Sequence, residues 1–160
     1  MGNSKIVFLD IDGVCTSLDC SYMNPPSKYA LNENCIARIK RILDETGAKI
    51  VWITNWRTHT DNLWKTHHGT YHSLLPKARE IFKDYILDDA PHSHGRMKFY
   101  DVEEWLCNNS DKCDHFVIID DQCSEGLEGF GENFHRTAFE TGITDKDADE
   151  IISFLNEIDS

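Results

Sequence analysis

Two pairs of aspartates stand out in the sequence because each pair directly follows a run of apolar residues. The first pair is Asp10 and Asp12, and the second is Asp120 and Asp121. Four carboxylates gathered at one place repel one another unless a cation neutralises them or some of them take up protons. Oxygen ligands without cysteine or histidine favour Mg²⁺ over Zn²⁺. We therefore expect a magnesium site if the two runs lie side by side.

Two further side chains could complete a site for phosphoryl transfer. Thr54 ends the apolar run that begins at Lys49, and Lys98 opens an amphipathic segment. In such a site a metal and an ammonium group neutralise the phosphate, a hydroxyl orients it and a carboxylate attacks it. Each residue also has an ordinary interpretation, since threonine favours strands and a lysine at a helix start is commonly solvated. Arg96 is a rival for the role of Lys98.

The elements that would position these residues alternate between short apolar strands and amphipathic helices. Strands are predicted over Lys5–Leu9, Lys49–Thr54, Ile86–Leu87, His115–Ile119 and, as an edge strand, Arg136–Phe139. Helices are predicted over Asn32–Glu45, Asp61–His67, Lys77–Tyr85, Lys98–Cys107 and Thr144–Ile158. This alternation predicts a parallel sheet covered on both faces, with its active crevice beyond the carboxyl ends of the strands.

The composition limits the class of protein and of partner. The 160 residues suffice for one domain with one core, so we treat 1–160 as a single domain. A net charge of −12 argues against a general nucleic-acid clamp, which needs a positive field to attract phosphates. The longest apolar runs are too short to span a bilayer, and the first residues lack the apolar core of a signal peptide. We expect a cytoplasmic protein without a membrane partner.

The cysteines and histidines form no recognisable metal motif. The six cysteines include no Cys-x-x-Cys pair, and we expect reduced thiols. The histidines between residues 59 and 94 have an irregular spacing that fits zinc sites poorly, so we expect solvated side chains rather than ligands. That expectation covers His67, His68, His72, His92 and His94.

The order of four short segments makes a family resemblance specific. FLDIDGV at 8–14, VWIT at 51–54, Lys98 at a helix start and VIIDD at 117–121 resemble the four motifs of the haloacid dehalogenase superfamily, in the expected order. The resemblance spans about Lys5 to Asn156. It implies an α/β, three-layer Rossmann-like fold in which helices flank a central parallel sheet.

The resemblance also implies a role for each motif residue. Asp10 would be the nucleophile that becomes an aspartyl phosphate, and Asp12 would protonate the leaving oxygen and then activate water. Thr54 would hydrogen-bond a phosphoryl oxygen, and Lys98 would hold the nucleophile and the phosphate together. The implied Mg²⁺ ligands are Asp10, Asp120, Asp121 and the backbone carbonyl of Asp12. The second aspartate of the first motif marks phosphatases, because the dehalogenase members lack it, and an alkoxide leaving group needs a positioned acid.

A narrower resemblance concerns the residues after the second motif. Asn55-Trp56-Arg57, together with Glu104-Trp105-Leu106, is similar to small members of the superfamily associated with RNA-repair proteins. It implies that Arg57 contacts phosphate bidentately, and Gly13 and Asn55 are the other candidates for contacting the substrate. A packed aromatic residue beside a surface cation explains Trp56 and Arg57 equally well.

The lengths of two intervals bear on the substrate. The superfamily inserts its cap domains where this chain has only the 17 residues Cys15–Leu31 or the 40 residues Thr58–Met97. The resemblance therefore implies a cap-less member, whose open site favours a substrate that covers the site itself, such as a protein or a nucleic-acid end. The net charge of −12 opposes a long polynucleotide unless basic residues gather on one face.

A non-enzymatic module that binds phosphate or metal is the alternative function. Receiver domains of response regulators also gather acidic residues, a threonine and a lysine at the edge of a parallel sheet. Their acidic pair follows the first strand and their phosphoacceptor a central strand, whereas here an Asp-Asp pair follows Lys98. A stable aspartyl phosphate without turnover would favour this alternative.

Overall fold

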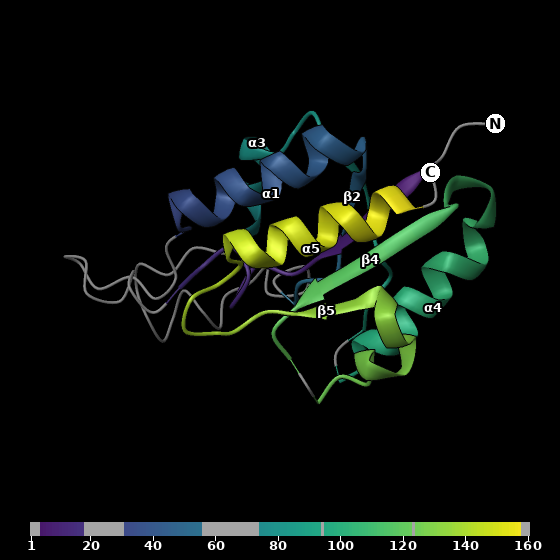
Figure 1. Ribbon diagram of the computed structural model, residues 1–160. Helices are drawn as coiled ribbons and strands as arrows, with labels where there is room; N and C mark the ends of the chain where they lie inside the picture. The colour runs from purple at the N-terminus through teal and green to yellow at the C-terminus, as the bar shows by residue number, and fades with distance from the viewer. Residues whose placement is uncertain (1–3, 18–30, 56–73, 94, 123, 158–160) are drawn as a thin grey trace.

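The computed structural model describes residues 4–17, 31–55, 74–93, 95–122 and 124–157. The strands are β1 (Lys5–Leu9), β2 (Lys49–Trp52), β3 (Ile86–Asp89), β4 (His115–Asp120) and β5 (Phe134–Arg136). They form one parallel sheet of five strands in the order β3-β2-β1-β4-β5. Figure 1 shows β4 and β5, the last two strands in this order, side by side. This is the order of Rossmann-type sheets, whereas receiver domains have the order 2-1-3-4-5. The sheet therefore lacks the strand order of a receiver domain.

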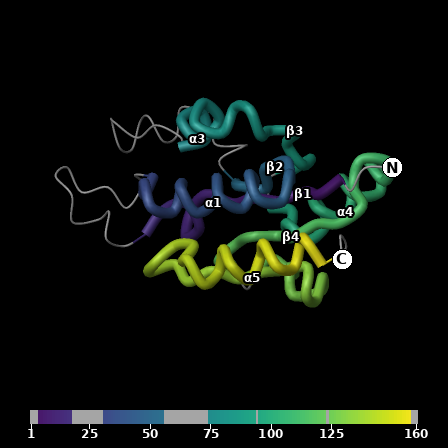
Figure 2. Tube along the Cα trace, turned by 45° about the horizontal axis from the view of Figure 1, so that its top comes forward, coloured from purple at the N-terminus to yellow at the C-terminus, as the bar shows by residue number. Residues whose placement is uncertain are grey.

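Helices cover both faces of the sheet. They are α1 (Glu33–Thr46), α3 (Leu75–Ile81), α4 (Lys98–Asn108) and α5 (Asp145–Asn156), with 3₁₀ segments η3 (Ser110–Lys112) and η4 (Leu127–Asn133). Helices α1 and α5 contact each other and lie side by side in both views (Figure 1, Figure 2). The apolar core residues divide accordingly, with α1, α3 and α5 on one face and α4 with η4 on the other. The three-layer arrangement predicted from the sequence is confirmed.

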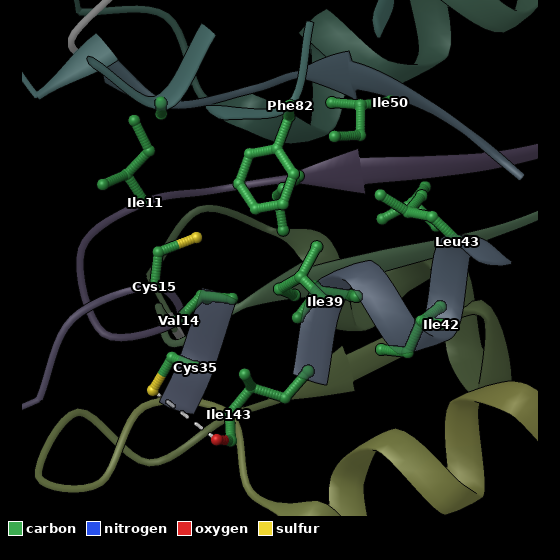
Figure 3. Close-up of a cluster of buried hydrophobic side chains, with 14 of the residues drawn as sticks. Ile11, Val14, Cys15, Cys35, Ile39, Ile42, Leu43, Ile50, Phe82 and Ile143 are labelled. Carbon is green, nitrogen blue, oxygen red and sulfur yellow. Dashed lines mark hydrogen bonds between the residues drawn. The ribbon is translucent and has the colours of Figure 1, made fainter. Parts of the chain in front are cut away.

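The core follows from the alternation of side chains along the strands. In β1, Val7 and Leu9 belong to the cluster under α1, α3 and α5, whereas Ile6 and Phe8 belong to the cluster under α4. Figure 3 shows the first cluster, in which Ile39 of α1 lies beside Val14 and Cys15, which follow β1. On the other face, the rings of Phe8 and of Trp105 in α4 pack edge to face, with their centroids 5.5 Å apart. Both faces of the strands are thus buried, as their continuous apolar runs predict.

Helix ends follow the expected capping chemistry. The Asn32 side chain accepts hydrogen bonds from the backbone N–H of Asn34 and Cys35, and Gly47 ends α1 in the left-handed conformation, with φ of 74°. Thr144 caps α5 in a capping box with Asp147. These caps confirm the predicted starts of both helices, and α5 ends at Asn156 rather than Ile158.

Several predicted boundaries are corrected. β2 ends at Trp52 rather than Thr54. The helix expected over 77–85 runs over 75–81, because Pro76 sits in its first turn, where the missing N–H costs nothing. The strand expected at 136–139 is 134–136, because the chain turns back there and Gly142 N–H donates to Ala138 C=O at 2.8 Å.

The intervals in which a cap could be inserted are accounted for in part. α3 and β3, which both belong to the sheet-and-helix core, lie in the second interval. The helix predicted at 61–67 lies outside the described residues. No helix in the described part of the chain is long and apolar enough to cross a membrane.

Candidate active site

The parallel pairing of β1 with β4 brings the two aspartate motifs together. Leu9 pairs with Ile119, and the backbone N–H of Asp10 donates to Ile119 C=O at 3.1 Å. Since Phe8 and Ile118 both face α4, and side chains alternate along a strand, Asp10 and Asp120 two residues further on continue that face. The alternation thus aims both carboxylates at the start of α4.

Lys98, the first residue of α4, lies between these two carboxylates. Its Nζ is 2.7 Å from Oδ2 of Asp120 and 3.4 Å from Oδ1 of Asp10, and the residue is 2% exposed. Burial alone would lower the pKa of Lys98, but the charges of Asp10 and Asp120 outweigh burial and raise it. The buried ammonium therefore stays protonated at neutral pH.

Glu125 holds the start of α4 in place. The backbone N–H of Lys98 donates to Oε2 of Glu125 at 2.9 Å, and Phe99 N–H donates to the Glu125 carbonyl at 3.1 Å. Met97, which precedes the helix, makes no side-chain cap, so Glu125 satisfies N–H groups that the first turn leaves open. No sequence signal pointed to Glu125, because it lies 27 residues after Lys98.

Arg96, the rival for the lysine position, is engaged elsewhere. Its guanidinium donates to Oε1 of Glu104 at 3.1 Å and to the Tyr100 carbonyl at 3.0 Å, and lies 3.5 Å from Oδ1 of Asp101. These partners belong to α4 itself, so the group at the aspartate motifs is Lys98.

Asp10, Asp120 and Asp121 form a cluster of buried carboxylates. Each offers an oxygen within 4.8 Å of the others. Burial, reinforced by the charge of Asp120, raises the pKa of Asp10 to about 7. Burial, reinforced by Asp10, raises the pKa of Asp121 to about 6, and burial also raises the pKa of Asp120 despite Lys98. A single lysine therefore does not neutralise the negative charge of the three carboxylates.

The donor set fits a hard divalent cation. Oδ1 of Asp121 is buried and accepts no hydrogen bond from the residues that the structure describes. A buried carboxylate oxygen without a donor is costly unless a cation binds it. Three carboxylates with free oxygen lone pairs are ligands that Mg²⁺ accepts.

The turn after β1 makes room for Asp121. Gly13 has a φ of 76°, and a Cβ at this position would overlap the Asp121 carboxylate. The turn is closed by Cys15 N–H, which donates to Ile11 C=O at 2.8 Å. Asp12 lies in this turn and is partly exposed. Its acid–base role and the metal contact of its carbonyl stay predictions, as does substrate contact by Gly13.

The second motif lies at the same edge of the sheet. Ile53 N–H donates to Leu9 C=O at 3.0 Å, which places the next residue, Thr54, beside the end of β1. Thr54 is fully buried and Asn55 is exposed. Their contacts with phosphate stay predictions, and Arg57 lies outside the described residues.

The end of β5 and the residue that follows it also border the carboxylates, and the sequence did not point to them. Thr137 donates from N–H to Asp120 C=O at 3.0 Å and from Oγ1 to Gly13 C=O at 2.6 Å. Arg136 donates from Nε to Asp121 C=O at 3.2 Å. An edge strand was predicted here, but only the strand order shows that it lies beside β4.

His92 corrects the expectation that the histidines are solvated. Its side chain is 7% exposed, and Nδ1 lies 2.5 Å from Oδ2 of the fully buried Asp101. The other histidines singled out in the sequence lie outside the described residues. The cysteines that the structure does describe are free thiols: Cys15, Cys35, Cys107 and Cys113.

Comparison with known proteins gives a family match. A family model described as a HAD domain in Swiss Army Knife RNA repair proteins matches residues 6–148. The matched interval runs from β1 into α5 and contains all four motifs. No curated protein and no solved structure matches the chain.

Proposed function

This chain belongs to the family of HAD domains in Swiss Army Knife RNA repair proteins, and from that premise we propose that it is a magnesium-dependent phosphomonoesterase. The family supports a phosphatase-type hydrolase in general terms. The more specific proposal is that Asp10 forms an aspartyl phosphate and that the substrate carries an exposed terminal phosphate.

One observation carries the proposal: Asp10 and Asp120 share the buried ammonium of Lys98. A carboxylate in a buried site attacks a phosphate dianion only if positive charge offsets the repulsion between them. Lys98 supplies one such charge at 3.4 Å from Asp10. Mg²⁺ held by Asp10, Asp120, Asp121 and the Asp12 carbonyl would supply the rest of the neutralising charge.

The chain's own residues can then carry both halves of the reaction. Asp10 forms a bond to phosphorus as the bond to the ester oxygen breaks, and the departing oxygen takes a proton from Asp12. Asp12, now a carboxylate, accepts a proton from water, and the water oxygen bonds to phosphorus as the bond to Asp10 breaks. Phosphate leaves and Asp10 is restored. Lys98 stays protonated and holds Asp10 in place throughout.

The substrate and setting follow from the surroundings of the site. Within the second interval, α3 and β3 belong to the core of the fold rather than to a cap, which supports an open site and a substrate that brings its own bulk. We propose a phosphorylated macromolecular end, with a nucleic-acid end as the leading case because of the family to which the chain belongs. The free thiols support a reducing, cytoplasmic setting.

The test is an assay of aryl phosphate hydrolysis with Mg²⁺, with EDTA and with Asp10→Asn. We expect loss of the nucleophile to lower kcat by ~10⁴-fold or more, and EDTA to abolish turnover. Asp111→Asn, which removes an exposed carboxylate in η3, is the matched control and keeps the wild-type rate. Equal rates in all arms would reject the proposal, and a stable phosphorylated chain without turnover would favour the non-enzymatic alternative.

A further inference from the structure

A pocket beside the carboxylate cluster has no role in the reaction as proposed. Its volume is about 340 Å³, and it is lined by Asp121, Arg136, Thr137, Ala138, Phe139 and Glu140. Of these residues only Asp121 belongs to the catalytic cluster. Ligand pockets in proteins commonly measure about 300–1,000 Å³, so this one has room for a small group next to the reacting phosphate.

Arg136 is the cation of this pocket. Its Nε is anchored on the Asp121 carbonyl at 3.2 Å, and the residue is exposed. The other arginines in the described ranges each pair with a carboxylate: Arg38 with Asp145, Arg41 with Glu45, Arg79 with Asp89 and Arg96 with Glu104. Within those ranges Arg136 has no carboxylate partner within 4.0 Å. The anchored guanidinium leaves Nη1 and Nη2 for an anion.

Phe139 supplies an aromatic surface to the same pocket. It is 45% exposed, among the most exposed large apolar side chains in the described residues. Aromatic rings exposed beside a cation bind nucleobases by stacking, without regard to the base, while the cation binds the backbone phosphate. The pocket therefore combines an aromatic ring and a cation, the two groups with which proteins bind single-stranded nucleic acids.

The backbone around the pocket argues against an extended peptide as the bound group. Thr137 N–H is used by Asp120 C=O, and Ala138 C=O accepts from Gly142 N–H at 2.8 Å. A peptide strand binds through free backbone donors and acceptors, and these two are already engaged. Recognition here depends on the side chains of Arg136 and Phe139.

We propose that this pocket binds the nucleotide next to the terminal phosphate of a single-stranded nucleic-acid substrate. Its base stacks on Phe139, and its phosphodiester is bound by Nη1 and Nη2 of Arg136. The inference rests on the proposed phosphatase function, since it places the terminal phosphate at Asp10. Recognition of one nucleotide needs one local cation rather than a positive face, which agrees with a net charge of −12.

The kinetic test compares nucleoside monophosphates with dinucleotides that carry the same terminal phosphate, at the 3′ or the 5′ end. We expect the wild-type kcat/KM to rise roughly 10-fold when the second nucleotide is added. Phe139→Ala and Arg136→Gln should bring the ratio of kcat/KM for the dinucleotide to that for the monophosphate close to 1. Phe139→Tyr should retain the wild-type ratio. The controls are Leu87→Ala, 44% exposed on β3, and Arg41→Gln on α1, which keep the wild-type ratio.

A second measurement separates phosphate contact from general structural support. Binding of a labelled oligonucleotide is followed by fluorescence anisotropy in EDTA at several salt concentrations. Loss of one phosphate contact in Arg136→Gln should make the slope of log K against log salt less steep by about 0.7. Phe139→Ala should weaken binding and leave the slope unchanged, because stacking releases no counterion.

The outcomes distinguish the inference from the function on which it rests. One outcome is that turnover depends on Asp10, while both pocket variants keep the wild-type ratio of kcat/KM between dinucleotides and monophosphates. That result overturns the inference but leaves the proposed phosphatase function intact. A second outcome is that the rate rises for phosphopeptides but not for dinucleotides, and that Phe139→Ala removes this rise. That result also overturns the inference, in favour of a protein substrate. If no substrate is turned over, the function fails, and equal oligonucleotide binding by wild type and both variants then overturns the inference as well.

Discussion

Lys98 donates a 2.7 Å hydrogen bond from Nζ to Oδ2 of Asp120, and neither residue is more than 2% exposed. The bond joins the start of α4 to the end of β4. A buried ion pair of this kind contributes little net stability, but removal of one partner leaves a buried charge uncompensated. Because Asp10 shares the same ammonium, the pair also sets the charge around the candidate nucleophile.

We predict that Lys98→Met abolishes phosphatase activity and destabilises the metal-free protein by about 3–5 kcal/mol at neutral pH. The loss of stability should be smaller at pH 5, where the carboxylates take up protons. The measurements are kcat for an aryl phosphate and thermal melting at both pH values. Lys5→Met is the matched control, because Lys5 is also buried but bonds to Asn156, outside the site. Stability lost equally at both pH values would contradict this account.

The carboxylate cluster predicts an unusual pH dependence for the metal-free protein. Folding raises the pKa of Asp10 to about 7 and of Asp121 to about 6, from 3.8, chiefly through burial. Between about pH 4 and pH 7 the folded state therefore binds more protons than the unfolded chain, and the free energy of unfolding falls as the pH rises. Thermal melting in EDTA across this range should show Tm falling with rising pH.

Mg²⁺ should restore much of the stability that the metal-free protein loses as the pH rises. A ligand at 100 times its Kd stabilises the folded state by about 2.7 kcal/mol, and each kcal/mol moves Tm by roughly 2–4 °C in a chain of this size. We expect the shift to be large at pH 7.5 and small at pH 5, because protons compete for the same oxygens. Asp10→Asn should raise the Tm of the metal-free protein at pH 7.5 and reduce the Mg²⁺ shift. A Tm that is independent of Mg²⁺ at pH 7.5 would argue against a cation in the cluster.

Gly13→Ala should impair the site more than the fold. The left-handed φ of 76° disfavours alanine, and its Cβ would overlap the Asp121 carboxylate, which has to move. Strain of this kind costs about 1–3 kcal/mol, whereas displacement of a metal ligand should lower Mg²⁺ affinity by 10-fold or more. The comparison is Gly47→Ala, which has a similar φ of 74° and no atom within 4 Å of its Cβ. If the two variants bind Mg²⁺ equally, the close approach of Gly13 to Asp121 has no bearing on the metal.

His92→Leu should destabilise the protein without removing catalysis. The substitution takes one hydrogen-bond partner from the buried Asp101, at a cost of about 1–3 kcal/mol. Denaturant unfolding of His92→Leu, Asp101→Asn and the double variant measures the coupling, and we expect the double variant to lose less than the sum of the single losses. Strict additivity would show that the two side chains do not act as a pair.

The parts of the site that sequence reasoning anticipated are those determined by local chemistry. A buried strand that ends in Asp-x-Asp-Gly, another that ends in Asp-Asp, and a lysine at the start of an amphipathic helix are readable because each depends on a few consecutive residues. The strand over Lys5–Leu9 and the start of the helix at Lys98 therefore match the structure. Boundaries after Ile81 and Arg136 were wrong because turns formed by later residues end those elements.

Other features depend on contacts between distant segments. Glu125 caps a helix that begins 27 residues before it, and His92 is buried because Asp101 of α4 is its partner. The sequence favoured Lys98, at the start of an amphipathic helix, over its rival Arg96, but did not settle the choice. It is decided by the direction in which α4 presents the two side chains, one toward β1 and β4 and the other toward its own Glu104.

Sequence alone determined which reactive groups this protein offers, because residue types and their order along the chain specify which groups are available at the ends of the strands. Only the tertiary structure decided which groups meet. The order β3-β2-β1-β4-β5 places the end of β5 beside β4, and this neighbour relationship brings Arg136 and Phe139 to the edge of the carboxylate cluster. The physical reason is that parallel strand pairing joins segments far apart in the chain, and no short stretch of sequence encodes its partner.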